Sequence, residues 1–191
     1  MFNDRYGLTE AVLSGRKTQT RRIYKTPANA YGGLVVENGS IISFDANGNE
    51  IVTRPKYKVG EVAAIAQCYK DFGAYCIDSR AMTNKMFVKA EYMPHHIRIT
   101  NVHVERLQDI SDEDCIKEGI ETMESYVIRT DGTKKTLNYY RLAYRCKSGR
   151  VLNLSGSTPR EVYAALIDRI SGKGTWEANP YVFVYDFELV D

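Results

Sequence analysis

Two Asn-Gly pairs most constrain the fold of this chain, because each marks a tight turn between short apolar runs. Asn38-Gly39 lies between residues 34–36 and 41–44, and Asn47-Gly48 lies between 41–44 and 51–53. Asn-Gly is the strongest short signal for a two-residue hairpin turn, since both residues tolerate positive φ. The sequence therefore predicts a three-stranded antiparallel meander here.

Further strands are predicted along the rest of the chain. Residues 59–69 are mostly small and apolar and follow a turn at Gly60, which predicts a buried strand. Runs at 86–92, 96–107 and 181–190 predict three more strands. The chain lacks a G-x-G-x-x-G or Walker motif and lacks the strand–helix alternation of a parallel Rossmann-type sheet.

Two helices are predicted from capping signals. Ser111 and Asp114 form an S-x-x-D start, and Gly119 closes this helix. Thr158 is followed by proline and, three positions on, by glutamate, and that helix is expected to end at Gly172. With many strands and a few peripheral helices, the predicted fold class is α+β, mainly β, in a single domain.

A basic cluster follows the first predicted helix, for which Thr9 is the expected cap and Gly15 the end. The chain as a whole carries a net charge of only +2, so the cluster is a local feature. Cations beside threonine hydroxyls suit phosphate or the polar edge of a nucleobase, although a solvated strand edge is the alternative. Four cations and two threonines make up the cluster: Arg16, Lys17, Thr18, Thr20, Arg21 and Arg22.

Glu118 is a second candidate functional residue. It lies in the last turn before Gly119, where a carboxylate faces the negative end of the helix dipole. Two interpretations are open. Glu118 is either a surface residue that tolerates a small cost, or a carboxylate aimed into a pocket as acid, base or acceptor for a base edge.

Neither the cysteines nor the histidines form a metal-binding pattern. The four cysteines include no C-x-x-C pair, and no carboxylate spacing completes a set with the three histidines. We therefore predict no metal and no cofactor. No apolar stretch has the length of a signal peptide or a membrane span, so we expect a cytoplasmic protein without a membrane partner.

Taken in order, these segments resemble the ASCH family, whose members have a PUA-like β-barrel. Four blocks carry the resemblance: the first helix with residues 15–22, the turn at 59–61, the segment 98–119, and 176–187. The chain is similar to larger, phage-associated members that carry an insertion before the last helix. Residues 122–157 are the corresponding insertion, expected to be partly extended with a turn at Ser148-Gly149.

The resemblance implies a cleft beside the glycine-lysine motif and a general role in binding RNA or a nucleoside-like ligand. A small bacterial member with a similar G-x-K-x-x-T motif is an amidohydrolase that removes acetyl from N4-acetylcytidine. It uses the lysine and threonine of that motif and a glutamate in the helix after the central strand. By motif position these are Lys17, Thr20 and Glu118.

Three functions are left open: an RNA- or nucleoside-binding module, an amide hydrolase acting on a modified nucleoside, and a non-catalytic regulatory protein of phage or mobile-element origin. In the hydrolase, Thr20 is the nucleophile, Lys17 its base and Glu118 the acid or substrate orienter. The larger relatives usually have Arg-Glu where this chain has Ala66-Gln67, which would alter the charge of the cleft. The predicted ligand-binding residues are Arg16, Arg21, Arg22, Gln67, Arg98 and Trp176.

Overall fold

The computed structural model describes residues 2–74, 78–145 and 149–190, and over these ranges the protein is mainly β. The strands are β1 (Gln19–Ile23), β2 (Val35–Glu37), β3 (Ser40–Phe44), β4 (Glu50–Thr53), β5 (Val62–Ala64), β6 (His96–Arg106), β7 (Glu121–Ile128), β8 (Lys134–Arg145), β9 (Val151–Gly156) and β10 (Tyr181–Leu189). The α-helices are α1 (Leu8–Leu13), α2 (Asp112–Lys117), α3 (Pro159–Ser171) and α4 (Thr175–Ala178). None of these helices is both long and apolar enough to cross a membrane.

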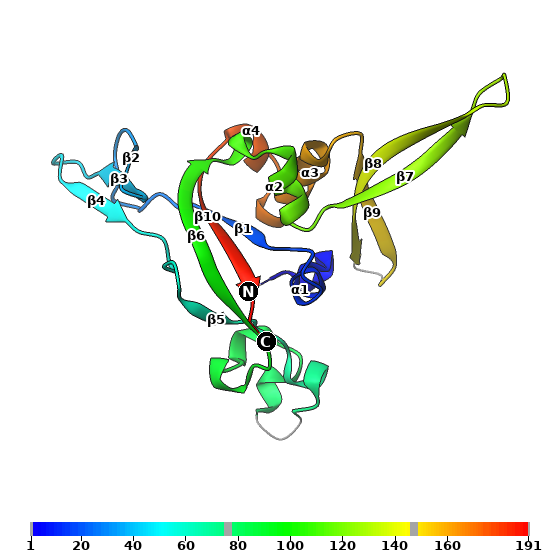
Figure 1. The fold of residues 1–191 in the computed structure, drawn as a ribbon. Coiled ribbons are helices and arrows are strands. Elements are labelled where there is room, and N and C mark those ends of the chain that lie inside the picture. Colours follow the sequence, from blue (N-terminus) through cyan, green and yellow to red (C-terminus); the bar gives the residue numbers. More distant parts are fainter. Residues whose placement is uncertain (1, 75–77, 146–148, 191) are drawn as a thin grey trace.

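The central sheet is antiparallel, with the strand order β1-β10-β6-β5. Its two long strands, β6 and β10, curve together beside the helices (Figure 1), and their register shifts between Asp186 and Phe187. A bulge of this kind bends a strand and increases its twist. Val182 and Val184 are fully buried on β10, so this strand forms the middle of the core. β1 and β5 are the sheet edges, so within the described residues the hydrogen bonding does not close into a ring.

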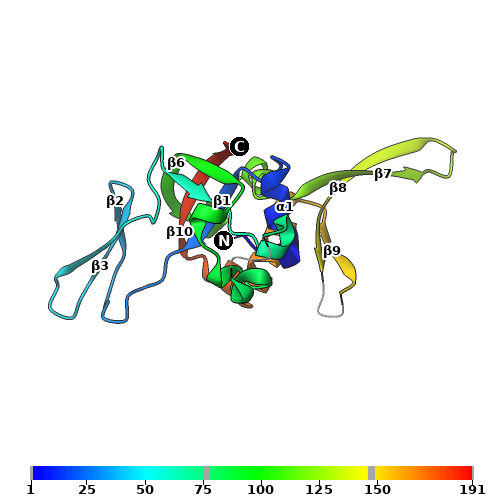
Figure 2. The same ribbon diagram turned by 90° about the horizontal axis from the view of Figure 1, so that it is seen from below.

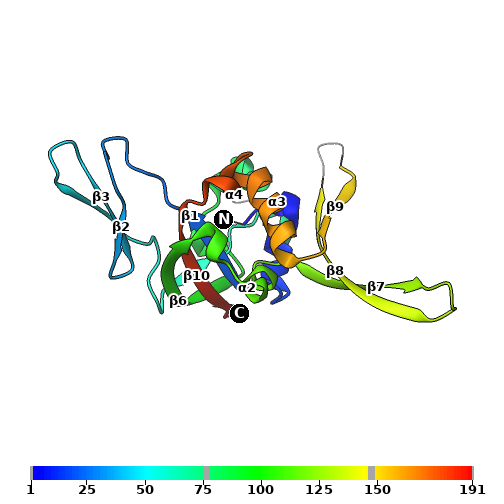
Figure 3. The same cartoon turned by 90° about the horizontal axis from the view of Figure 1, so that it is seen from above.

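Two smaller sheets extend from opposite sides of the central body (Figures 1, 2 and 3). One is the predicted meander β2-β3-β4. Asn38 has φ 49° and Gly39 φ 71°, which are the positive values that a tight hairpin turn requires. The other sheet, β7-β8-β9, is formed by the region expected to be a partly extended insertion. The turn predicted at Ser148-Gly149 falls partly outside the described residues.

The capping predictions for the two later helices are confirmed. Ser111 Oγ accepts a hydrogen bond from Asp114 N at 3.1 Å, and Thr158 Oγ1 accepts one from Glu161 N at 3.2 Å. The predicted cap of α1 is wrong. Gly7, with φ 63°, is the N-cap because it joins α1 to a preceding 3-10 turn, Asp4–Tyr6. Thr9 instead lies inside α1 and is buried.

One strand prediction is confirmed in part and another fails. The predicted strand 59–69 contains β5, and its backbone bonds to the β6 side of the sheet run from Gly60 to Ile65. Beyond this point the amide of Cys68 donates to the Asp71 carboxylate and the chain turns into a 3-10 helix. The segment 86–92 forms 3-10 turns at Lys85–Phe87 and Ala90–Tyr92. There the Asn84 side chain accepts from the Met86 amide at 3.0 Å. Local side-chain bonds of this kind compete with strand pairing.

Candidate functional site

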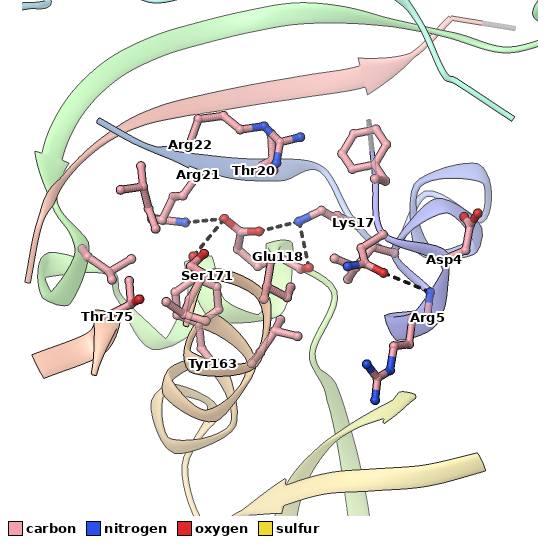
Figure 4. A pocket seen from close by; sticks show the side chains of 18 of the residues that line it. Asp4, Arg5, Lys17, Thr20, Arg21, Arg22, Glu118, Tyr163, Ser171 and Thr175 are labelled. Carbon is pink, nitrogen blue, oxygen red and sulfur yellow. Dashed lines mark hydrogen bonds and ion pairs between the residues drawn. The ribbon is translucent and has the colours of Figure 1, made fainter. Parts of the chain in front are cut away.

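A cavity of about 900 Å³ lies between β1, the N-terminal segment and α3. Its wall includes Lys17, Thr20 and Glu118, which come from the start of the central sheet and the end of α2 (Figure 4). The structure thus brings together the three residues to which the resemblance gives catalytic roles. The apolar part of the wall comes mostly from the N-terminal segment, α1 and α3: Phe2, Leu8, Leu107, Leu166, Ile167 and Ile170.

The charged side chains of this wall are predominantly basic. It contains six basic and two acidic residues, an excess of four formal positive charges. Each acid has a basic partner in the same wall, since Asp4 pairs with Lys85 at 2.6 Å and Glu118 pairs with two cations. A ligand entering the cavity therefore meets mainly positive charge. The basic residues are Arg5, Lys17, Arg21, Arg22, Lys25 and Lys85.

Lys17 and Glu118 form a buried ion pair at the centre of the site. Lys17 Nζ donates to Glu118 Oε2 and also to the Glu118 backbone oxygen at 2.9 Å and to the Gln19 backbone oxygen at 2.7 Å. Lys17 is 1% exposed and Glu118 5%. The lysine therefore also caps the C-terminal end of α2, where a cation is favourable. The interpretation of Glu118 as a surface residue is wrong.

Arg21 contacts the Glu118 carboxylate as a second cation. Its Nη1 donates to Glu118 Oε1 at 3.2 Å, and its Nε donates to Glu105 Oε1 at 2.7 Å. Its Nη2 lies 3.5 Å from Asp114 Oδ2, and the side chain is 1% exposed. Tyr163 Oη also donates to Glu118 Oε1, at 3.5 Å. Two cations and one hydroxyl therefore hold the carboxylate in place.

Burial shifts the protonation of two groups around Glu118. It lowers the pKa of Lys17 below the ordinary 10.5, and the charge of Glu118 opposes this shift only in part. It raises the pKa of Tyr163 well above 10.0, an effect that the Glu118 charge reinforces. Tyr163 is therefore a neutral donor. The three bonds that Lys17 donates use all the protons of an ammonium group, so Lys17 must lose a proton before it can accept one.

Thr20 lies on β1 in the same wall and is 8% exposed. Within the described residues, no hydrogen bond joins Thr20 to Lys17 or Glu118 (Figure 4). Its hydroxyl therefore shares the cavity with the ion pair without belonging to the buried network.

Of the other predicted ligand-binding residues, one lines the cavity and four lie outside it. Arg22 lines the cavity with Arg21, and its guanidinium lies 5.9 Å from the centre of the Phe2 ring. The remaining four are not in the cavity wall, and each has other surroundings. Arg16 pairs with Glu121, Arg98 pairs with Glu188, Gln67 is buried beside Met93, and Trp176 packs against Tyr163.

Sequence reasoning missed several residues of this network. Asp114 was assigned only to a helix cap, although its carboxylate also faces Arg21. Tyr163 had a usable signal, because residues 163, 166, 167 and 170 follow the i, i+3, i+4, i+7 spacing of one helix face. Glu105 gave no local signal, since its role depends on the pairing of distant strands.

Comparison with protein-family models, curated proteins and solved structures finds no match for this chain. Over residues 2–74, 78–145 and 149–190, no group of three or more His, Cys, Asp or Glu side chains is arranged to hold a metal ion.

Proposed function

We propose that the protein binds a nucleoside or nucleotide-like ligand in the cavity beside Glu118. The observation that carries this proposal is a buried carboxylate held in place within a largely basic wall. A carboxylate offers about four acceptor positions, and Lys17, Arg21 and Tyr163 occupy three of them. The remaining position can accept from the exocyclic amino group of a base such as cytosine.

The positive charge of the wall supports a nucleotide-like ligand, which carries a phosphate. Arg22 and Lys25 are exposed side chains of this wall, whereas Arg21 is buried in the network. Exposed cations next to a base-binding carboxylate suit the phosphate of a nucleotide. The ligand would place its base against Glu118 and its phosphate toward Arg22 and Lys25.

We also propose that the fold is a PUA-like barrel. The curved antiparallel sheet, with α1 and α2 beside the start of β1, supports a PUA-like barrel of the ASCH type as the architecture. In such a barrel the ligand cleft lies beside the glycine-lysine motif, where Lys17 and Thr20 line the cavity here.

Calorimetric titration with cytidine 5′-monophosphate and N4-acetylcytidine tests the binding function. We expect both to bind. Arg22→Ala should weaken binding of the monophosphate and lower its salt dependence, because one phosphate contact is lost. Arg98→Ala is the matched control, since it removes the same charge from an exposed site on β6 outside the cavity. No binding of either ligand, or equal losses in both variants, would contradict the proposal.

Amide hydrolysis is a second candidate function, favoured by the position of Thr20 in the same wall as Lys17. With Lys17 neutral, Thr20 Oγ1 would attack the acetyl carbonyl carbon of N4-acetylcytidine and pass its proton to Lys17 Nζ. The bond from N4 to the carbonyl carbon would then break, and N4 would take that proton and leave as cytidine. Water would hydrolyse the acetyl ester on Thr20 to acetate.

Chromatography of N4-acetylcytidine after incubation with the protein tests this reaction. Wild type should release cytidine, Thr20→Ala should release none, and Thr20→Ser should keep part of the activity because it retains a hydroxyl. Equal release by wild type and Thr20→Ala would exclude Thr20 as the nucleophile. If the protein binds N4-acetylcytidine without releasing cytidine, ligand binding is its function and amide hydrolysis is excluded.

A further inference from the structure

A second cavity, of about 400 Å³, adjoins the first at the end of β1. Arg22, Ile23 and Lys25 line both cavities, so the two share one wall. The rest of the second cavity comes from Tyr24 directly after β1, the end of β4, the segment after β4, and β10. It contains none of the residues of the Glu118 network.

The second cavity carries a concentrated positive charge. Four of its lining side chains are basic and, among the described residues, none is acidic. The whole chain has 26 basic and 24 acidic side chains, so a wall with four cations and no acid is far from the average composition. Such a wall suits an anionic group. The basic residues are Arg22, Lys25, Arg54 and Lys56.

Aromatic rings form most of the rest of this wall: Tyr24, Tyr57, Phe183 and Tyr185. Tyr57 and Tyr185 pack edge to face with their centres 5.8 Å apart, and the Lys56 amide donates to Tyr185 Oη at 2.8 Å. These contacts fix the orientation of the Tyr57 and Tyr185 rings. Tyr24, Phe183 and Tyr185 are buried, whereas Tyr57 is only half-buried, so a base in this cavity can stack on Tyr57. A stacking ring beside cations is an arrangement that binds single-stranded nucleic acid, since a base can stack and its phosphate can pair.

Tyr24 adds an independent indication of a ligand. It is 6% exposed, and its hydroxyl is buried without a hydrogen-bond partner among the described residues. A buried hydroxyl without a partner costs free energy. An oxygen of a ligand in this cavity would satisfy it.

We infer that the second cavity binds a phosphate-bearing nucleotide of the same strand whose neighbouring nucleoside occupies the first cavity. This inference rests on the proposed function and narrows its ligand to an oligonucleotide. Tyr24 lies four positions after Thr20 in extended chain, and a strand rises about 3.3 Å per residue, so the two residues are roughly 13 Å apart. A free nucleoside is too small to reach from Thr20 in the first cavity to Tyr24 in the second, whereas a strand of a few nucleotides can do so.

The test compares N4-acetylcytidine with an RNA tetranucleotide that contains one N4-acetylcytidine, by calorimetry at several salt concentrations. The variant Arg54→Ala/Lys56→Ala removes two exposed cations of the second cavity only. Its matched control is Arg129→Ala/Lys135→Ala, which removes the same charge from exposed positions at and beside the tip of the β7–β8 hairpin.

We expect the tetranucleotide to bind wild type more tightly than the nucleoside. Arg54→Ala/Lys56→Ala should weaken tetranucleotide binding about tenfold and reduce the salt slope by about 1.4, since each single-strand phosphate contact contributes about 0.7. Nucleoside binding should not change, and the control variant should behave as wild type.

Two results would overturn the inference. In the first, wild type binds the nucleoside and the tetranucleotide with equal affinity. In the second, Arg54→Ala/Lys56→Ala still binds the tetranucleotide more tightly than the nucleoside, by the same factor as wild type. Either result would show that the second cavity contributes nothing to binding. Both would leave the proposed function intact, because the nucleoside still binds. Absence of binding by both ligands would overturn the proposed function and the inference together.

Discussion

Lys17 and Glu118 are 101 positions apart in the sequence, and the lysine contacts the glutamate twice. Its ammonium pairs with the carboxylate and also donates to the backbone oxygen of the same residue at 2.9 Å. One side chain therefore fixes both the charge in the cavity wall and the end of α2. Changes to this pair are expected to affect stability and ligand binding together.

Removal of the Glu118 carboxylate should be strongly destabilising. In Glu118→Ala the buried Lys17 loses its ion-pair partner and Arg21 loses one of its acids, and breaking a buried pair in this way costs about 3–5 kcal/mol. Glu121→Ala is a close control, because Glu121 also pairs with two cations but is more exposed. This substitution should lower the free energy of unfolding by no more than about 1 kcal/mol. Urea denaturation measures both, and similar losses would mean that burial of the Glu118 pair is unimportant.

Gly119→Ala should disturb both the fold and the site. Gly119 has φ 107°, which an alanine adopts only with strain, and a Cβ there would lie 3.6 Å from Lys17 Cβ. Strain of this kind costs about 1–3 kcal/mol. Gly132→Ala also places alanine at positive φ, 81°, but in open space at the β7–β8 turn. Denaturation of both variants measures the loss of stability, and ligand titration measures the loss of binding. Only Gly119→Ala should weaken binding.

If Lys17 is the base of an amide hydrolase, the rate should rise with pH. Burial lowers the pKa of Lys17 below 10.5, so the neutral amine becomes populated and the rate should level off before that pH. Glu118 raises this pKa by its charge. The residual activity of Glu118→Gln should therefore rise at lower pH than that of wild type. The pH profile of kcat/KM for N4-acetylcytidine tests this, and a rate that falls with pH would exclude Lys17 as the base.

Cys115 should be unreactive in the folded protein. Its side chain is fully buried, and burial raises the pKa of its thiol to about 12. Only the thiolate reacts with iodoacetamide, so at about pH 8 almost none of the group is reactive. Peptide mass analysis should find Cys115 unmodified in native protein and alkylated in urea. Equal modification in both conditions would show that the α2 region opens readily.

The sequence predicts best those features that depend on neighbouring residues. The Asn38-Gly39 turn and the Ser111 and Thr158 caps are local, and the structure confirms all three. The strand predicted at 86–92 fails because the Asn84 side chain hydrogen-bonds the following backbone, which an apolar run does not reveal.

Long-range features were less accessible to prediction. Most of β7 and the start of β8 are exposed on both faces, so their sequences lack the alternation by which a half-buried strand is recognised. The Arg21 network depends on Glu105 and Tyr163, which reach it only through the pairing of distant segments. Motif position alone indicated that Lys17, Thr20 and Glu118 belong together, and the shared cavity wall agrees with that grouping.

The pairing of β1 with β10 has a consequence for the newly synthesised chain. Gln19 pairs with Asp186, so β1 leaves the ribosome well before its partner strand β10. At about 5–20 residues per second this delay is on the order of ten seconds. Until then the β1 edge next to β10 lacks its partner, and the cavity lacks its α3 wall until α3 has been made. The ligand can therefore bind only after α3 and β10 have been made, and a stop codon before α3 should give a protein without the site.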